Sequence, residues 1–228
     1  MAISEAAGNR ADADSAERRL KMVNGQLRTQ DVTDAAVLKA ILTVPRERFV
    51  AQAFAKHAYL DQDIPASGGS GRKLLAPRTV GRLLQAAAVK PGNRALEVGG
   101  GSGYGAALLS ELGAFVVAVE SEAGAVAATR AALAGYGDVK VIQGGLDKGA
   151  PDLGPFDVIL LNGAFEIAPL TLIDQLAAGG RLVGLDARSA SRRAVLIEKT
   201  GTGTSERSLF DASGDVLPGF AKTPSFSF

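Results

Sequence analysis

The feature that most constrains the fold is a cluster of glycines in LEVGGGSGYGAA, residues 96–107. The residues before it, NRALEVGG at 93–100, are typical of a buried β-strand, and YGAALLSEL at 104–112 is typical of a helix. Glycine lets the backbone adopt positive φ angles and lets a ligand approach the main chain closely. The pattern therefore predicts a strand-to-helix turn of a parallel α/β sheet, with a ligand beside it.

The same alternation continues through the centre of the chain. Each expected strand is a short apolar or β-branched run, and the helices between the earlier strands are rich in alanine and leucine. The expected strands are 113–120, 139–144, 156–162, 180–186 and 193–199, and the expected helices are 122–135 and 168–176. This order predicts an α/β, Rossmann-like fold with a doubly wound, mostly parallel sheet, whose ligand lies outside the carboxyl ends of the strands.

The remaining residues divide the chain into four parts. Residues 1–12 are polar or rich in alanine and glycine, and we expect them to be disordered. Residues 13–85 form a helical N-terminal lobe, in which a helix over 11–30 precedes one that stops at Val44-Pro45 and another follows Pro77. Residues 86–200 form the Rossmann-like core, and 201–228 a final strand and tail.

Composition excludes several classes of function. The 25 basic and 24 acidic side chains give a net charge of +1, so we expect no general nucleic-acid binding. With no cysteine and a single histidine, His57, no metal site is expected. No apolar segment reaches the length of a membrane span and no signal peptide is visible, which predicts a soluble, cytoplasmic protein with no membrane partner.

Two carboxylates beside the glycines indicate the cofactor. Glu120 ends the second strand, where a carboxylate accepts hydrogen bonds from ribose hydroxyls, so the ligand should contain adenosine. Glu97 lies two residues before Gly99, where it would repel a pyrophosphate but would suit the ammonium of a methionine moiety. S-adenosylmethionine therefore fits better than NAD.

Two alternatives remain open at this point. Gly101, Gly103 and Ala106 also match the loose pattern G-x-G-x-x-A, which would make the protein a nicotinamide-dependent oxidoreductase. The glycine turn could also serve only to pack a helix against a strand.

From about Met22 to about Val183 the chain resembles the protein-L-isoaspartate O-methyltransferase family. The resemblance rests on MVNGQLRTQDVTDAAVLKAILTVPRERFV, AYLDQDIP, LEVGGGSGYGAALLSEL and GPFDVILLNGAFEIAPLTLIDQLAAGGRLV. It implies a class I S-adenosylmethionine-dependent O-methyltransferase with a helical lobe over the acceptor side. The implied substrate is a protein or peptide with an isoaspartyl carboxylate, whose methylation leads to repair. The oligomeric state is not predicted.

The resemblance and the residue pattern together predict the cofactor site. We expect Glu97 near the methionine end, the glycine turn along the cofactor, Glu120 at the ribose, and Gly145 with Leu146 beside the adenine. The full predicted set is Glu97, Gly99, Gly101, Ser102, Gly103, Tyr104, Glu120, Ser121, Gly145 and Leu146.

Two segments depart from the family. Where the family has Thr-Ile-Ser-x-Pro, this chain has KLLAP, so Leu75 stands at the place of the serine whose hydroxyl contacts the reacting carboxylate. Where the family has Gly-Asp-Gly, with the aspartate at the adenine, this chain has Gly144-Gly145-Leu146, and Asp147 lies two residues after Gly145. The departures leave open a family member with a different acceptor, or one that binds the cofactor without catalysis.

The acceptor side has several polar candidates. They are Tyr59, Asp61, Ser70 and Lys73. Arg72 and Arg78, like Lys73, could also reach inward and pair with an acidic acceptor.

Overall fold

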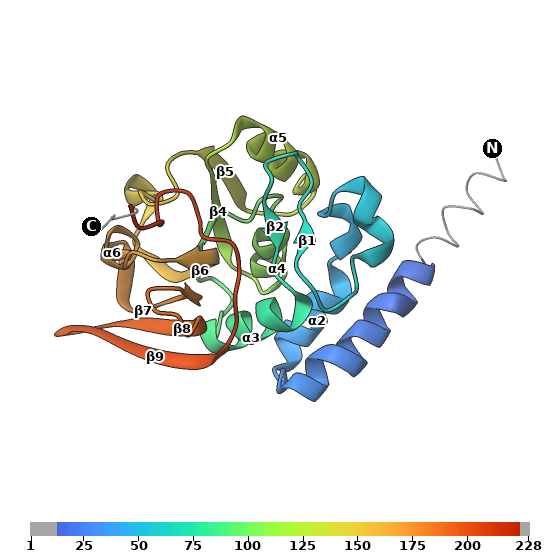
Figure 1. Cartoon of the computed structure of the whole chain (residues 1–228), viewed down its shortest axis with the longest axis horizontal. Helices are drawn as coiled ribbons and strands as arrows, with labels where there is room; N and C mark the ends of the chain where they lie inside the picture. The colour runs from blue at the N-terminus through green and yellow to red at the C-terminus, as the bar shows by residue number, and fades with distance from the viewer. Residues whose placement is uncertain (1–12, 224–228) are drawn as a thin grey trace, which may run out of the picture.

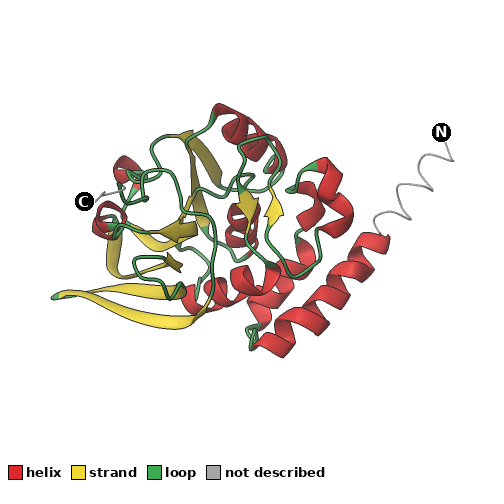
Figure 2. Ribbon diagram, viewed as in Figure 1, coloured by secondary structure: helices red, strands yellow, loops and turns green. Residues whose placement is uncertain are grey.

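The structure is a computed structural model that describes residues 13–223, so the expected disorder of residues 1–12 lies outside it. Its centre is a seven-stranded sheet with the order β5-β4-β3-β6-β7-β8-β9 (Figures 1 and 2). Strands β3 to β7 run parallel, and β8 and β9 are antiparallel to their neighbours. The strands are β3 Arg94–Val98, β4 Phe115–Glu120, β5 Val139–Gln143, β6 Phe156–Phe165, β7 Leu176–Asp186, β8 Arg193–Thr200 and β9 Gly203–Asp211. The predicted fold class is confirmed.

The central strands are apolar on both faces because helices and connecting segments cover both. In β3, Ala95 packs into the core on one side of the sheet, and Leu96 and Val98 pack into the core on the other side. The first core also contains residues of the helices α3 and α4, and the second contains residues of α6. The helices of the Rossmann-like core and its margin are α3 Pro77–Ala87, α4 Tyr104–Glu111, α5 Ala123–Ala132 and α6 Leu170–Asp174.

The N-terminal lobe is helical but less regular than predicted. Residues 13–22 are α-helical, and the expected single helix then continues as a π-helical turn and a 3₁₀ turn. Helix α2, Ala35–Thr43, starts at Asp34, whose carboxylate accepts a 2.8 Å hydrogen bond from the Ala36 N–H. It ends before Pro45, as predicted. The short helical turns of the lobe are Val23–Leu27, Arg28–Gln30, Arg46–Arg48 and Gln52–His57. A further short turn, Pro151–Leu153, precedes β6 in the Rossmann-like core.

A small hairpin that the sequence pattern did not predict lies beside the glycine turn. Its strands are β1 Ile64–Pro65 and β2 Lys73–Leu74, which pair antiparallel. Figure 1 shows the hairpin next to α4 and α5. Residues 66–72 between the strands lie against the main domain, because a Cβ added to Gly124 would be 2.6 Å from the Gly68 carbonyl oxygen. The loop therefore covers the carboxyl ends of β3 and β4.

The C-terminal part returns to the middle of the sheet. After β9, which is the expected final strand, the chain runs back so that the Leu217 N–H donates to the Ala164 carbonyl of β6 at 2.9 Å. Phe220 is buried there, and Phe210 is half-buried with the guanidinium of Arg82 stacked on its ring. Among residues 13–223, no helix is both long and apolar enough to cross a membrane.

Candidate active site

The site is built around the turn between β3 and α4. Gly99 and Gly101 adopt φ angles of +70° and +76°. Glycine adopts such positive angles without the steric cost that a Cβ would bring. A Cβ on Gly101 would lie 3.0 Å from the Ala66 side chain of the covering loop. The turn is therefore held between the sheet below and the loop above.

Glu97, near the end of β3, is completely buried beneath this turn. Its Oε1 accepts a 2.5 Å hydrogen bond from the Asn162 side-chain amide, whereas its Oε2 has no hydrogen-bond partner within residues 13–223. Burial, and after it the nearby charge of Glu120, raise the pKa of the Glu97 carboxyl to about 8, against the opposing effects of the Ala106 N–H, Arg72 and the Asn162 amide. A buried carboxyl with a free oxygen is a strong acceptor for a cationic group.

Glu120, the last residue of β4, is the second buried carboxylate. Its Oε1 accepts a 2.6 Å hydrogen bond from the Gly101 N–H, and its Oε2 has no partner. Burial raises the pKa of the Glu120 carboxyl, against the opposing effect of the positive Arg72. This carboxylate thus fixes the glycine turn with one oxygen, and its other oxygen has no partner among residues 13–223.

The Arg72 side chain reaches from the covering loop to the same place. Its guanidinium donates to the Gly99 carbonyl and, at 3.5 Å, to the Asn162 carbonyl. A Cβ on Gly99 would lie 2.7 Å from Nη2 of Arg72. Burial lowers the pKa of the arginine, and the nearby Glu120 and Glu97 raise it. Arg72 is thus the positive charge between the carboxyl ends of β3 and β6.

A cavity of about 200 Å³ adjoins this cluster on the side of β6. It lies between the covering loop, the start of β2 and the returning C-terminal segment. Its walls are Asp63, Ser70, Gly71, Arg72, Lys73, Leu75, Asn162, Gly163, Asp215, Val216, Leu217 and Pro218. The buried carboxylates therefore lie beside this cavity, and Arg72 and Asn162 connect the two places.

Comparisons with known proteins agree with this arrangement. Residues 17–210 match the family described as Protein-L-isoaspartate(D-aspartate) O-methyltransferase. The chain belongs to this family.

Named relatives cover most of the chain. A protein-L-isoaspartate O-methyltransferase of Koribacter versatilis (strain Ellin345) is 38% identical over 195 residues, which is 85% of this chain and 86% of the relative. One of Methylorubrum extorquens (strain PA1) is 43% identical over 171 residues, covering 75% of this chain and 74% of the relative. These relatives support the predicted S-adenosylmethionine-dependent O-methyltransferase activity and do not favour the alternative of a nicotinamide-dependent oxidoreductase.

Solved structures agree with the fold. One named protein-L-isoaspartate O-methyltransferase superposes with a TM-score of 0.77 at 25% identity; the match covers 88% of this chain and 66% of that chain, just under two thirds of its length. A Plasmodium falciparum protein described as a protein-L-isoaspartate O-methyltransferase in complex with S-adenosyl-L-homocysteine has a TM-score of 0.74 at 22% identity, covering 88% of this chain and 97% of that one.

The residues present fit the family's cofactor. Among the described residues, Glu97 and Glu120 each have a buried carboxylate oxygen without a partner. Gly99 has no Cβ, so its backbone is accessible at the place where Arg72 now lies. The Ser121 hydroxyl, next to Glu120, is also buried without a partner. Because the Arg72 guanidinium lies against Gly99, that side chain has to move aside for a ligand to use the same space.

Other predicted cofactor residues take structural positions. The Ser102 hydroxyl donates at 2.6 Å to the Phe49 carbonyl of the N-terminal lobe, and both Ser102 and Tyr104 are buried. The Tyr104 ring packs on Phe49 at 5.5 Å between centroids. Gly103 permits close packing of α5, since its Cβ would lie 2.9 Å from Thr129. These contacts give Ser102, Gly103 and Tyr104 packing roles, and their place at the cofactor stays a prediction.

The segment after β5 lies on the opposite side of the turn. The Leu146 side chain is buried, 3.0 Å from where a Cβ on Gly99 would stand, whereas Gly145 is exposed. Asp147 pairs with Lys148 at 2.9 Å and packs against Gly219. Leu146 thus reaches the turn, and Asp147 has a partner elsewhere.

The acceptor-side candidates separate into two groups. Ser70, Lys73 and Leu75 line the cavity. The Tyr59 hydroxyl donates to Glu47 within the helical lobe, and Asp61 pairs with Arg78 at 3.2 Å. Neither Tyr59 nor Asp61 lines the cavity.

Sequence reasoning does not single out two residues of the site. Asn162 lies within an expected strand, and its polar side chain near the carboxyl end of an apolar run is the signal that could have found it. Arg72 is one of three basic residues able to reach inward, and nothing in the sequence distinguishes it from Lys73 and Arg78. The structure brings Asn162 and Arg72 together at the carboxyl end of β3.

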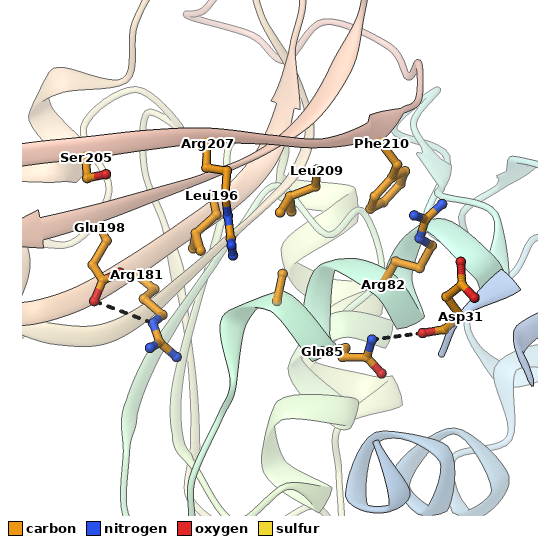
Figure 3. A pocket seen from close by; sticks show the side chains of 11 residues that line it. Asp31, Arg82, Gln85, Arg181, Leu196, Glu198, Ser205, Arg207, Leu209 and Phe210 are labelled. Carbon is orange, nitrogen blue, oxygen red and sulfur yellow. Dashed lines mark hydrogen bonds and ion pairs between the residues drawn. The ribbon is translucent and has the colours of Figure 1, made fainter. Parts of the chain in front are cut away.

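A second groove lies far from this chemistry. It has a volume of about 590 Å³ between α3 and the strands β7 to β9, and Figure 3 shows Arg181, Arg207 and Arg82 along it. Arg181 lies 4.0 Å from Glu198, and Gln85 donates to the Asp31 carbonyl at 2.9 Å. Arg181 pairs in register with Val158 near the start of β6, so this groove is not at the carboxyl ends of the strands.

Proposed function

We propose that this protein transfers the methyl group of S-adenosylmethionine to the side-chain carboxylate of L-isoaspartyl residues in proteins. The observation that carries the proposal is the pair of buried carboxylates, Glu97 and Glu120, each with one oxygen unpartnered among the described residues, beside a cavity of about 200 Å³ in a chain of this family. The product would be a methyl ester, which favours ring closure to a succinimide and so repair of the damaged residue.

The proposed cofactor contacts follow from the free atoms of the site. Oε2 of Glu97 would accept from the ammonium group of the methionine moiety, and Oε2 of Glu120 from a ribose hydroxyl. Gly99 lets this ligand approach the backbone, and Leu146 offers an apolar surface on the other side of the turn. The cofactor supplies an electrophilic methyl group on a sulfonium.

The chain has little covalent chemistry to perform. The acceptor carboxylate is already ionised at neutral pH, so no general base is needed. An acceptor oxygen forms the new C–O bond while the S–C bond breaks and its electron pair stays on sulfur. The residues of the cavity therefore act by holding the acceptor in line and by excluding water.

A methyl-transfer assay tests the proposal. The substrates are an isoaspartyl peptide and a peptide of the same sequence with normal aspartate, and calorimetric binding of S-adenosylhomocysteine is measured on the same protein sample. We expect binding and transfer to the isoaspartyl peptide alone. Binding without isoaspartyl transfer would contradict the proposed acceptor, and a lack of binding would contradict the proposed cofactor contacts.

A further inference from the structure

The cavity beside the buried carboxylates has Leu75 at the place where the family resemblance implies a serine hydroxyl. Leu75 is buried, and its Cδ2 lies 3.0 Å from where a Cβ on Gly214 would stand. Its backbone carbonyl accepts a 2.8 Å hydrogen bond from Arg46. This residue therefore contributes packing and one satisfied carbonyl, but no donor for a carboxylate.

Most polar groups along the cavity already have partners. Lys73 pairs with Asp215 at 3.2 Å, and the Asn162 amide donates to Glu97. Asp63 accepts a 2.7 Å hydrogen bond from the Ala76 N–H. Two acidic side chains, Asp63 and Asp215, line the cavity, so an anionic acceptor needs a positive group to offset their repulsion.

Among the described residues that line the cavity, two buried donors remain without partners. They are Nη1 of Arg72 and the hydroxyl of Ser70, and both residues line the cavity. A guanidinium is charged at neutral pH, and its planar fork matches a carboxylate in two parallel hydrogen bonds. Arg72 also donates to the Gly99 carbonyl, so it lies between the cavity and the glycine turn of the proposed cofactor site.

From this geometry we infer that Arg72, assisted by the Ser70 hydroxyl, binds the acceptor carboxylate in place of the hydroxyl that Leu75 lacks. The inference rests on the proposed function and assigns its acceptor-binding residue. Methylation converts the carboxylate to a neutral ester, so the ion pair with Arg72 is lost on product formation and the product is held less tightly than the substrate. Arg72 thus acts mainly through substrate binding.

The glycines of the loop give Arg72 the freedom this role requires. A Cβ on Gly71, next to Arg72, would meet nothing within 4 Å, and the same holds for Gly69. The loop segment that carries Arg72 is therefore not held by close contacts at these two positions. Its side chain can leave the Gly99 carbonyl and turn to the cavity that it already lines.

The test compares Arg72→Gln with Arg78→Gln. Arg78 is a matched control, because it follows on the same segment but pairs with Asp61 outside the cavity. Peptide affinity is measured by calorimetry on protein saturated with S-adenosylhomocysteine, using the isoaspartyl peptide and its uncharged isoasparaginyl counterpart. The KM and kcat of methyl transfer are measured separately.

We expect Arg72→Gln to weaken binding of the isoaspartyl peptide about tenfold to a hundredfold, the usual effect of losing a charged hydrogen bond. The KM should rise by a similar factor, with a smaller change in kcat, and selectivity over the isoasparaginyl peptide should disappear. Arg78→Gln should resemble the wild type. Adding Leu75→Ser to Arg72→Gln should restore part of the affinity, provided that thermal unfolding shows the double variant to be folded.

Unchanged peptide affinity and KM in folded Arg72→Gln would overturn the role of Arg72. The proposed function would stand, since the wild type would still methylate the isoaspartyl peptide. A variant that loses only affinity for S-adenosylhomocysteine would also overturn it, because Arg72 would then serve the cofactor. A wild type that neither binds nor methylates the isoaspartyl peptide would overturn the proposed function and this inference with it.

Discussion

Two glycine-rich segments face each other in this protein, and they differ in how closely their surroundings fit them. In the turn after β3, a Cβ on Gly99 would lie under 3.0 Å from the Arg72 guanidinium and 3.0 Å from Leu146. In the covering loop, Gly69 has nearly the same φ, +69° against +70°, but a Cβ there would meet nothing within 4 Å. The turn is closely packed at Gly99, whereas the covering loop is packed at Gly68, where a Cβ would lie 2.6 Å from the Ala128 side chain, and open at Gly69.

The difference separates two tasks. A closely packed turn holds its main-chain groups in one geometry, which suits recognition of a constant cofactor. An open loop can change its conformation at low cost, which suits a side that meets varied protein substrates. In agreement, the turn keeps the family's Gly-Ser-Gly-Tyr, whereas the Leu75 departure lies just after the loop.

The largest expected effect comes from the buried carboxyl beneath the packed segment. We predict that Glu97→Gln weakens binding of S-adenosylhomocysteine about tenfold to a hundredfold, because a neutral amide replaces the charged partner of the ammonium. Calorimetry measures the affinity, and Glu122→Gln, an exposed residue at the start of α5, is the control. Equal affinities for the two variants would show that the packed segment does not contact the ammonium.

A smaller effect should come from pH. Because the pKa of Glu97 is raised to about 8, its carboxyl is mostly protonated at pH 6 and becomes ionised as the pH rises. An ammonium ligand prefers the ionised form, so affinity for S-adenosylhomocysteine should rise between pH 6 and pH 8, by at most about tenfold per pH unit. Calorimetry across this range checks it. A flat profile would contradict the role of Glu97, and Glu97→Gln should remove the dependence.

The smallest expected change in affinity concerns Ser102, which sequence reasoning places at the cofactor and the structure places against Phe49. Ser102→Ala should lower stability by about 0.5 to 1.5 kcal/mol, because the Phe49 carbonyl loses one of its two donors and keeps the Ser67 N–H at 3.0 Å. Affinity for S-adenosylhomocysteine should change less than about threefold, which is a smaller change than the loss of one hydrogen bond to the ligand would cause. Thermal unfolding and calorimetry measure the two quantities, with Ser110→Ala on the following helix α4 as the control.

If Ser102→Ala instead lost affinity with no loss of stability, the hydroxyl would serve the cofactor, as the motif alone indicates. Ser102 would then belong to the residues that contact the ligand and not to those that pack the turn against the N-terminal lobe.

The local parts of this architecture could be predicted from the sequence. The apolar strands, the helix at Tyr104 and the positions of Glu97 and Glu120 at the strand ends all follow from patterns within a few residues. Such patterns are sufficient to locate both buried carboxylates of the site. They also locate the end of α2, because Pro45 cannot continue a helix.

The parts that escaped prediction depend on distant segments of the chain. Arg72 meets carbonyls 27 and 90 residues further on, and Ser102 meets one 53 residues earlier. Whether Arg72 or Lys73 turns inward is decided by the pairing of β1 with β2 and by the partner that Asp215 offers to Lys73. No local pattern contains that information.

The most direct test of the contrast between the two glycine segments is the affinity of Gly99→Ala and Gly69→Ala for S-adenosylhomocysteine, measured by calorimetry on folded protein. Both variants strain the backbone equally, since their φ angles differ by a single degree. We predict that Gly99→Ala loses more than about tenfold in affinity, whereas Gly69→Ala stays within about twofold of the wild type. Equal losses would contradict the account, because the packed turn would then be no more closely fitted to the cofactor than the open loop.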